Sequence, residues 1–293
     1  MPREIMSPTA ALSVNKSFDG KHTILFNEAS HRYKLNGKAC VGTTTMVKAG
    51  FPTAMGLISW MKGQSVNHLW NELFVQNDTK ASWDLRSEYG EGVYEDKRIE
   101  LFKAAKKADE KTAQQAADIG TLMHDYAYLT ELGKTAEADN LYNQILQLPD
   151  EVKTKVINGI TKFKDWKKTN KDELVASETL IASPSHLFCG KFDRLAKRDG
   201  ILVLDDFKSS NSIYLEHFIQ LGAYRIAIRE WMGLNVEAME ILRFGKESGE
   251  FETMLIDDPK ELQMFEDQAI RCRQTYEFRK MEQDPRFEWK GKK

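Results

Sequence analysis

One short stretch of this sequence places charged side chains where they could carry chemistry. The apolar run at 201–204 is followed directly by Asp205, Asp206, Phe207 and Lys208. An apolar run of this length bounded by polar residues predicts a buried strand. Because strand side chains alternate between faces, Asp206 and Lys208 share one face and Asp205 lies on the other. Charges at the end of a buried strand are costly without partners, so this end is the first candidate site.

The Asp-x-Lys spacing indicates a site only through its context. Similar acidic-x-Lys patterns occur at 78–80, 95–97, 165–167 and 258–260. Those lie in polar segments, where solvated surface charges explain them. Only the copy at 206–208 ends an apolar strand.

A second carboxylate is expected opposite Asp206. The pair Asp199-Gly200 predicts a tight turn between two strands. In such a hairpin Asp193 faces Asp206, close enough for both carboxylates to share a hard cation such as Mg²⁺ or Mn²⁺. A cluster of salt bridges with Lys208 and Lys191 explains the same residues, and for this pair alone both interpretations stay open.

Two predicted helices each carry a pair of residues spaced four apart, which puts both members on one helix face. Gly120 and His124 form the first pair, and the small glycine lets another backbone approach near the imidazole. Gln220 and Tyr224 form the second pair, on the helix that follows the strand of Asp206. Taken singly, each pair also fits ordinary packing.

Taken together and in this order, the four patterns resemble the PD-(D/E)xK nuclease superfamily. They are G-x-x-x-H at 120–124, G-x-x-D at 190–193, D-x-K at 206–208 and Q-x-x-x-Y at 220–224. The set is most similar to the RecB-type exonuclease branch, which includes phage exonucleases and the mitochondrial genome maintenance exonuclease. A weaker likeness to the phage members lies near the N-terminus, in residues 31–33, 36–37 and 43–45.

The resemblance implies a fold and an activity. The fold is a restriction-endonuclease-like α/β (α+β) arrangement, with a mixed central sheet flanked by helices and a small N-terminal β-meander. The activity is that of a metal-dependent DNA exonuclease acting on strand ends, preferring or threading single-stranded DNA, in phage-type recombination or DNA processing. A structure-specific endonuclease or nickase of the same fold and a catalytically inactive nucleic-acid-binding module are the alternatives. A single-strand annealing protein is an implied partner.

The resemblance also implies a metal site. It implies that Mg²⁺ or Mn²⁺ is bound by His124, Asp193, Asp206 and the backbone carbonyl of Phe207. Oxygen ligands suit Mg²⁺, and the single imidazole makes Mn²⁺ acceptable as well. Glu178, on the preceding strand, is a further candidate carboxylate, with a plain surface charge as its alternative.

The catalytic set implied by the resemblance combines two metal-binding carboxylates, Asp193 and Asp206, with three other residues. Lys208 is expected to orient or deprotonate the attacking water, with a pKa lowered by nearby cations. Gln220 and Tyr224 are expected to hold Lys208 or the substrate phosphate.

Composition limits the class of protein further. The chain has 293 residues, with 42 Lys and Arg against 44 Asp and Glu, so a nucleic-acid site must be a local patch such as the lysine-rich helix expected at 151–168. The chain has three cysteines, Cys40, Cys189 and Cys272, and they form no CxxC pair. This pattern argues against an iron–sulfur cluster and against a disulfide framework. It favours a cytoplasmic protein, in the host cytoplasm if the protein is phage-encoded. The sequence has no long apolar run, so no membrane association is expected.

The expected organisation is a flexible arm at 1–21, a β-meander with helices at 22–96, and a nuclease core at 97–293 that could form a single domain with 22–96. Helices are expected at 54–74, 97–133, 135–148, 151–168, 213–232 and 260–281. Strands are expected at 22–26, 31–35, 38–45, 174–182, 187–196, 201–207, 236–244 and 251–256.

Overall fold

The computed structural model of this chain describes residues 12–51, 114–246 and 249–283. Residues 1–52 and 122–293 make one compact unit and residues 53–121 another. The helix expected at 54–74 and the first part of the helix expected at 97–133 lie outside the described residues. Residues 114–131 are helical. All elements labelled below belong to the first unit.

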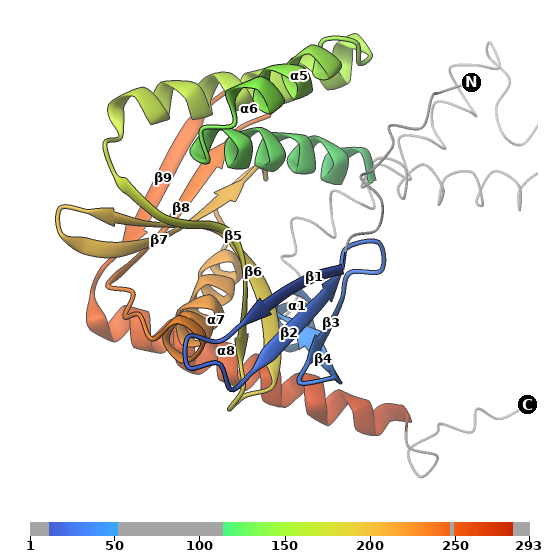
Figure 1. Cartoon of the computed structure of the whole chain (residues 1–293), viewed down its shortest axis with the longest axis vertical. Coiled ribbons are helices and arrows are strands. Elements are labelled where there is room, and N and C mark those ends of the chain that lie inside the picture. The colour runs from blue at the N-terminus through green and yellow to red at the C-terminus, as the bar shows by residue number, and fades with distance from the viewer. Residues whose placement is uncertain (1–11, 52–113, 247–248, 284–293) are drawn as a thin grey trace, which may run out of the picture. The chain divides into compact units, whose positions relative to one another are not determined.

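The first unit is built on a nine-stranded mixed sheet (Figure 1). In chain order its strands are β1 (Leu12–Lys16), β2 (Thr23–Asn27), β3 (Arg32–Leu35), β4 (Lys38–Gly42), β5 (Glu173–Ser183), β6 (Phe188–Arg198), β7 (Ile201–Lys208), β8 (Ala238–Phe244) and β9 (Phe251–Ile256). They run in the order β1-β2-β3-β4-β6-β7-β8-β9, and β5 pairs with β6. The β4–β6 and β7–β8 pairs are parallel and the others antiparallel. The predicted α/β class with a mixed central sheet is confirmed.

The predicted tight turn at Asp199-Gly200 is present, and a turn of the same kind lies at Asn36-Gly37, because the residues of both turns accept positive φ. Asn36 and Gly37 have φ of 50° and 79°, and Asp199 and Gly200 have φ of 51° and 93°. The second turn sets the β6–β7 register, in which Arg194 pairs with Asp205.

Strand β6 changes its neighbour along its length, and this creates a fork in the sheet. Along one side it pairs with β5 from end to end. On the other side, Val41 and Gly42 of β4 pair with Phe188 and Cys189, whereas β7 pairs with residues 194–198. Between these two contacts lie residues 190–193, which have no strand partner on that side in the described part of the chain. Asp193 is therefore placed where β7 leaves β6.

Helices cover both faces of this sheet (Figure 1). The helices α1 (Thr43–Gly50), α7 (Leu215–Met232) and α8 (Pro259–Arg279) pack on one another, and α7 also packs on β5. The helices α5 (Thr135–Ile145) and α6 (Asp150–Thr169) belong to the other layer, where Phe163 of α6 contacts Phe207 and Phe244 edge-on. None of the described helices is long and apolar enough to cross a membrane.

Two expectations for the N-terminal region are wrong. Residues 12–16 do not belong to a loose arm, because they form β1 and pair with β2; residues 1–11 lie outside the described part. The strand expected at 38–45 ends at Gly42, where α1 begins. Its threonines favour a strand locally, but Met46 and Val47 are buried, and a Cβ on Gly50 would lie only 2.3 Å from the Cα of Cys272 on α8. Tertiary packing therefore overrides local propensity here.

Candidate metal centre

The carboxylate of Asp193 lies at the fork between β6 and β7 and is held by the backbone around it. The amide of Phe207 donates a hydrogen bond of 2.7 Å to Asp193 Oδ2. The hydroxyl of Ser177 donates to the backbone carbonyl of Asp193 at 2.9 Å. Burial alone would raise the pKa of Asp193, but His124, Lys208 and the Phe207 amide lower it below its usual value. Asp193 is therefore held as an anion.

The imidazole of His124 faces this carboxylate. His124 Nδ1 lies 3.5 Å from Asp193 Oδ2, and the ring packs edge-on against Phe207 with centroids 6.1 Å apart. Burial favours the neutral ring, yet the carboxylates of Asp193 and Glu178 outweigh it and raise the pKa of His124 to about 9. The local field thus favours a positive charge at this point.

Glu178 approaches the same point from β5. Ser177 pairs with Arg194 and Thr179 with Phe192, so Glu178 falls opposite Asp193. Its backbone has a φ of 45°, a left-handed conformation that costs a non-glycine residue about 1–2 kcal/mol. Burial and the Asp193 carboxylate raise the pKa of Glu178, against the opposing effects of Lys191 and His124. Lys191 Nζ lies 2.5 Å from Glu178 Oε2.

His124, Glu178 and Asp193 together form a group able to hold a metal ion. Each offers one ligand atom, and the three atoms lie within 4.8 Å of one another. Two carboxylate oxygens and one imidazole nitrogen fit a hard or borderline divalent cation. Such a cation would also relieve the repulsion between the two carboxylates.

The buried Asp206 and the half-buried Lys208 form an ion pair beside this group. Lys208 Nζ lies 2.5 Å from Asp206 Oδ2, and Asp206 is outside the set of three atoms within 4.8 Å. Burial raises the pKa of Asp206 to about 6, with Asp193 adding to the shift and Lys208 opposing it. Burial by itself would lower the pKa of Lys208, but Asp206 and Asp193 raise it. These two carboxylates favour the protonated amine, and the lowering of the Lys208 pKa by a bound cation stays a prediction.

Helix α7 supplies the support for Lys208. Lys208 Nζ donates to Gln220 Oε1 at 3.4 Å, and Gln220 Nε2 donates to Tyr224 Oη at 2.7 Å. The Tyr224 ring occupies the space beside Gly190, where a Cβ would lie 2.5 Å from Tyr224 Cε1 and 2.8 Å from Thr43 Oγ1. The glycine of the G-x-x-D pattern is thus required by packing of the tyrosine of the Q-x-x-x-Y pattern.

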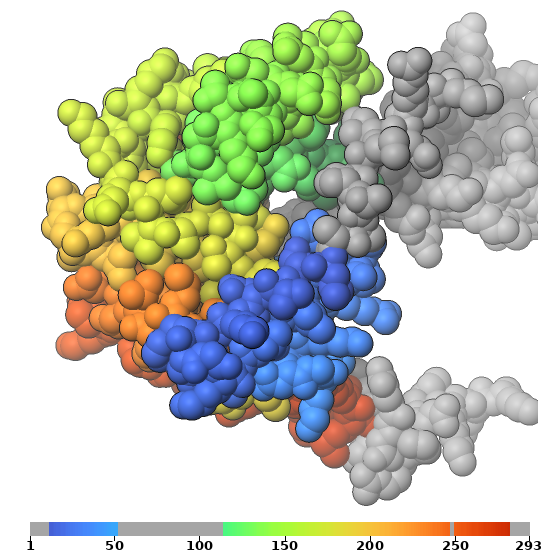
Figure 2. Space-filling model, in the orientation of Figure 1, coloured from blue at the N-terminus to red at the C-terminus, as the bar shows by residue number. Residues whose placement is uncertain are grey.

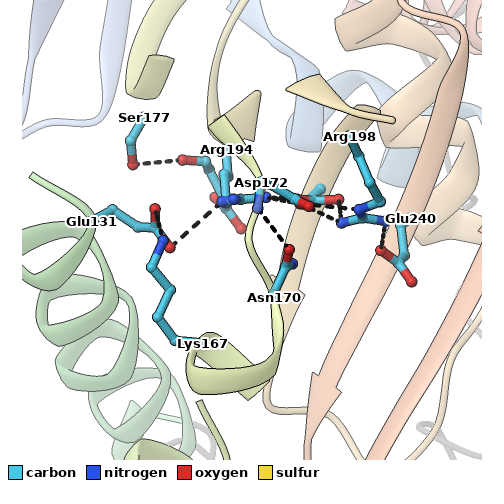
Figure 3. A network of polar contacts seen from close by, with 10 residues as sticks. Glu131, Lys167, Asn170, Asp172, Ser177, Arg194, Arg198 and Glu240 are labelled. Carbon is cyan, nitrogen blue, oxygen red and sulfur yellow. Dashed lines mark hydrogen bonds and ion pairs between the residues drawn. The ribbon is translucent and has the colours of Figure 1, made fainter. Parts of the chain in front are cut away.

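Asp205 lies away from this group, on the opposite sheet face, as the alternation of strand side chains predicts. It forms ion pairs with Arg194 and Arg198 within a largely buried charged network. The other members are Glu131, Lys167, Asp172 and Glu240 (Figure 3). Sequence reasoning did not identify this network. One local signal was available, since the predicted hairpin register places Arg194 opposite Asp205 and thereby pairs a cation with an acid.

An open groove leads away from Glu178. Its walls come from β1, β2 and β5, from the helical residues 125–129 and from α5, and Figure 2 shows the N-terminal strands and the green helices on its two sides. The charged residues that line it are Glu28, Asp125, Glu137, Glu178 and Lys191. Four acids against one lysine make this groove unfavourable for a nucleic-acid backbone. A separate small pocket, lined mainly by apolar side chains such as Phe163, Phe207 and Phe244, also borders His124 and Lys208.

Most lysines of α6 already have partners within the described part of the chain. Lys153, Lys155 and Lys168 pair with acids on α6 itself, Lys167 pairs with Glu131, and Lys164 lies over the rings of Tyr126 and Tyr142. These contacts favour a solvated helix face over a basic stripe for DNA.

A group of two carboxylates and a histidine lies at the fork of a mixed sheet, beside a half-buried lysine, and is able to hold a metal ion. A divalent cation at such a point suits phosphate chemistry. A family model of the PD-(D/E)XK nuclease superfamily matches residues 96–288. The chain belongs to this superfamily, and its central mixed sheet with flanking helices is consistent with the restriction-endonuclease-like fold. It is therefore a nuclease.

Two solved structures are similar to parts of the chain. One is a candidate exonuclease from Eubacterium rectale, which is 11% identical in sequence. The match covers 55% of this chain and 68% of that chain, with a TM-score of 0.34. The other is the protein SSO0001, which is 12% identical in sequence. The match covers 50% of this chain and 73% of that chain, with a TM-score of 0.24. Among curated proteins, none matches this chain.

Proposed function

We propose that this chain is a DNA exonuclease dependent on Mg²⁺ or Mn²⁺ that hydrolyses phosphodiester bonds from strand ends. The observation that carries the metal dependence is the convergence of His124, Glu178 and Asp193 within 4.8 Å. The exonuclease type and a preference for single-stranded DNA are proposed from the resemblance of the motif set. The same resemblance suggests a role in phage-type recombination beside a single-strand annealing protein.

The three converging side chains would hold the cation, and Asp206 and the carbonyl of Phe207 are the further ligands that the motif set proposes. When bound, the cation would supply Lewis-acid polarisation of the scissile phosphate and a more acidic bound water. Asp193 is suited to its role because the Phe207 amide and His124 keep it ionised. The strained backbone of Glu178 supports a functional reason for presenting a carboxylate at this point.

Lys208 would act on the phosphate as a fixed positive charge. Its carboxylate neighbours favour the protonated amine, and Gln220 and Tyr224 hold that amine in place. A protonated amine donates hydrogen bonds to phosphate oxygens and stabilises the charge that develops on them. A cation held by Asp193 and Asp206 would offset these carboxylates and lower the pKa of Lys208, so orienting or deprotonating the attacking water is the second role we propose for Lys208.

The charged residues of the groove beyond Glu178 are four acids and one lysine. We infer that the phosphodiester chain does not reach the metal group through this groove, because its acids repel the phosphates.

Digestion of labelled DNA tests the function. The substrates are end-labelled linear and closed circular DNA, single- and double-stranded, each with Mg²⁺, Mn²⁺ or EDTA. Loss of label from linear DNA only, and only with metal, is expected. Cleavage of closed circles would instead identify an endonuclease, and inactivity on every substrate with both metals would favour a binding module.

A pair of matched carboxylate variants tests the site. Asp193→Asn is expected to lower the cleavage rate by about 1,000-fold, because several kcal/mol of metal-derived stabilisation are lost. Asp125→Asn is the control, since Asp125 follows His124 in the chain but lies outside the converging group. Equal activity of the two variants would contradict the site assignment.

A further inference from the structure

The helix that carries His124 has a second buried contact with the sheet. Glu131 follows His124 by seven residues, which places both on one helix face about two turns, or roughly 10 Å, apart. The side chain of Glu131 has 0% exposure, and its Oε1 lies 3.5 Å from Arg194 Nε. Lys167 of α6 donates a hydrogen bond of 2.8 Å to the other oxygen, Oε2 (Figure 3). A carboxylate buried to this extent needs such cations to remain charged.

Arg194 directly follows Asp193 in β6, and both residues contact the helix of His124, at two different points. Asp193 faces His124 and Arg194 faces Glu131. A helix held at one point could rotate about that contact or slide along its axis, and each residue of slippage is 1.5 Å of rise and 100° of rotation. A second contact two turns away, which combines the 3.5 Å ion pair with Arg194 and the hydrogen bond from Lys167, opposes both movements.

Arg194 is itself a fixed point. It is fully buried, it forms ion pairs with Asp205 and Asp172, and its guanidinium lies over the ring of Trp166 at 5.1 Å. A planar guanidinium held on several sides loses little further freedom when it meets another carboxylate. Arg194 therefore connects the helix of His124 to the strand hairpin that carries Asp206.

We propose that Glu131 is a positioning residue for the metal centre: its ion pair with Arg194 fixes the rotation and the axial position of the helix, so that His124 faces Asp193. The inference rests on the proposed metal site. Glu131 is not itself a metal ligand. It would affect metal binding indirectly, by setting the position of the helix that carries His124. Outer residues that orient metal ligands typically change metal affinity by about 10- to 100-fold when they are removed.

The test measures Mn²⁺ binding to the full chain without DNA, by electron paramagnetic resonance of free Mn²⁺, together with urea unfolding. The variants are Glu131→Gln, His124→Asn and the double variant. Glu131→Gln keeps the side-chain shape, and Arg194 keeps Asp205 and Asp172, so folding is expected to survive. Glu266→Gln is the control. Glu266 of α8 is also buried (3% exposed) and also pairs with arginines, but these arginines, Arg225 and Arg229, lie on α7 and outside the converging group.

We expect Glu131→Gln to raise the Kd for Mn²⁺ about tenfold in the wild-type background and by less than about twofold in the His124→Asn background. Glu266→Gln is expected to lower stability and to leave the Kd unchanged. An unchanged Kd in Glu131→Gln, or the same loss with and without His124, would overturn the proposal. If Glu131→Gln does not unfold cooperatively, Glu131→Asp replaces it under the same criteria.

The outcomes also separate this inference from the proposed function. Failure of the wild-type chain to bind Mn²⁺ would reject the metal site and with it the proposed function. Binding that His124→Asn weakens and Glu131→Gln does not would reject only the positioning role of Glu131.

Discussion

We predict that the protein loses stability in mild acid because of His217 on α7. Replacing His217 with a residue that cannot be protonated should remove this loss. Its side chain is buried (8% exposed), and burial together with the charge of Lys208 lowers the pKa of His217 from 6.5 to about 3. Its Nδ1 accepts a hydrogen bond from the backbone N–H of Tyr214 at 3.2 Å, which only an unprotonated nitrogen can do. The Tyr214 ring packs edge-on against it, with centroids 5.4 Å apart.

The sign and size of the effect follow from linkage between protonation and folding. The unfolded chain protonates this histidine below about pH 6.5, whereas the folded protein keeps it neutral down to about pH 3. The unfolded state therefore binds the extra proton, and the free energy of unfolding falls as the pH falls through this window. The loss is about 1.4 kcal/mol per pH unit, which amounts to about 2 kcal/mol at pH 5.

Urea unfolding at pH 7.5 and pH 5.0 measures this loss. His217→Asn keeps a short hydrogen-bond acceptor but cannot be protonated in this range, so its loss of stability on acidification should be smaller than that of the wild type by about 2 kcal/mol. Leu215→Ala, at an exposed position (62%) of the same helix turn, is the control and should keep the wild-type pH dependence. Equal losses in wild type and His217→Asn would refute the reasoning.

Three further predictions concern residues around the site. Gly190→Ala should lower the free energy of unfolding by about 1–3 kcal/mol and reduce cleavage, because the new Cβ would lie 2.5 Å from Tyr224 Cε1; wild-type urea stability would contradict this. Glu178→Asn should retain or slightly raise the melting temperature, since Asn tolerates positive φ, while weakening Mn²⁺ binding at least about tenfold; full Mn²⁺ affinity would exclude Glu178 as a ligand. Arg194→Met should cost about 3–5 kcal/mol in urea unfolding, because Asp205 and Asp172 lose a buried cation, and a loss below about 1 kcal/mol would show that Arg198 compensates.

Local rules in the sequence determined the central hairpin and the orientation of its charges. The turn at Asp199-Gly200 needs residues that accept positive φ, and strand alternation needs only the order of the residues. These two rules were enough to place Asp206 and Lys208 on one face and Asp205 on the other, which the structure confirms. Helix α7 and its end at Gly233 were likewise readable, because periodicity and a glycine with positive φ (68°) are local signals.

Contacts between distant segments were decided by the tertiary structure. The hairpin register predicted that Asp206 faces Asp193, but the pairing of β6 with β7 ends at Arg194 and Asp205. The converging group takes its second carboxylate, Glu178, from β5, while Asp206 pairs with Lys208. No local pattern indicates that a glutamate in a strand will adopt positive φ, because the strain is sustained by the surrounding sheet.

The contact between Glu131 and Arg194 shows the same limit most clearly. The two residues are far apart in the chain, and each separately resembles a surface charge, yet both are fully buried. Burial of such a pair depends on how a helix lies on the sheet, and that arrangement is a property of the packed fold. The sequence by itself therefore predicted the chemistry of the site, whereas the tertiary structure decided which carboxylates lie close to His124.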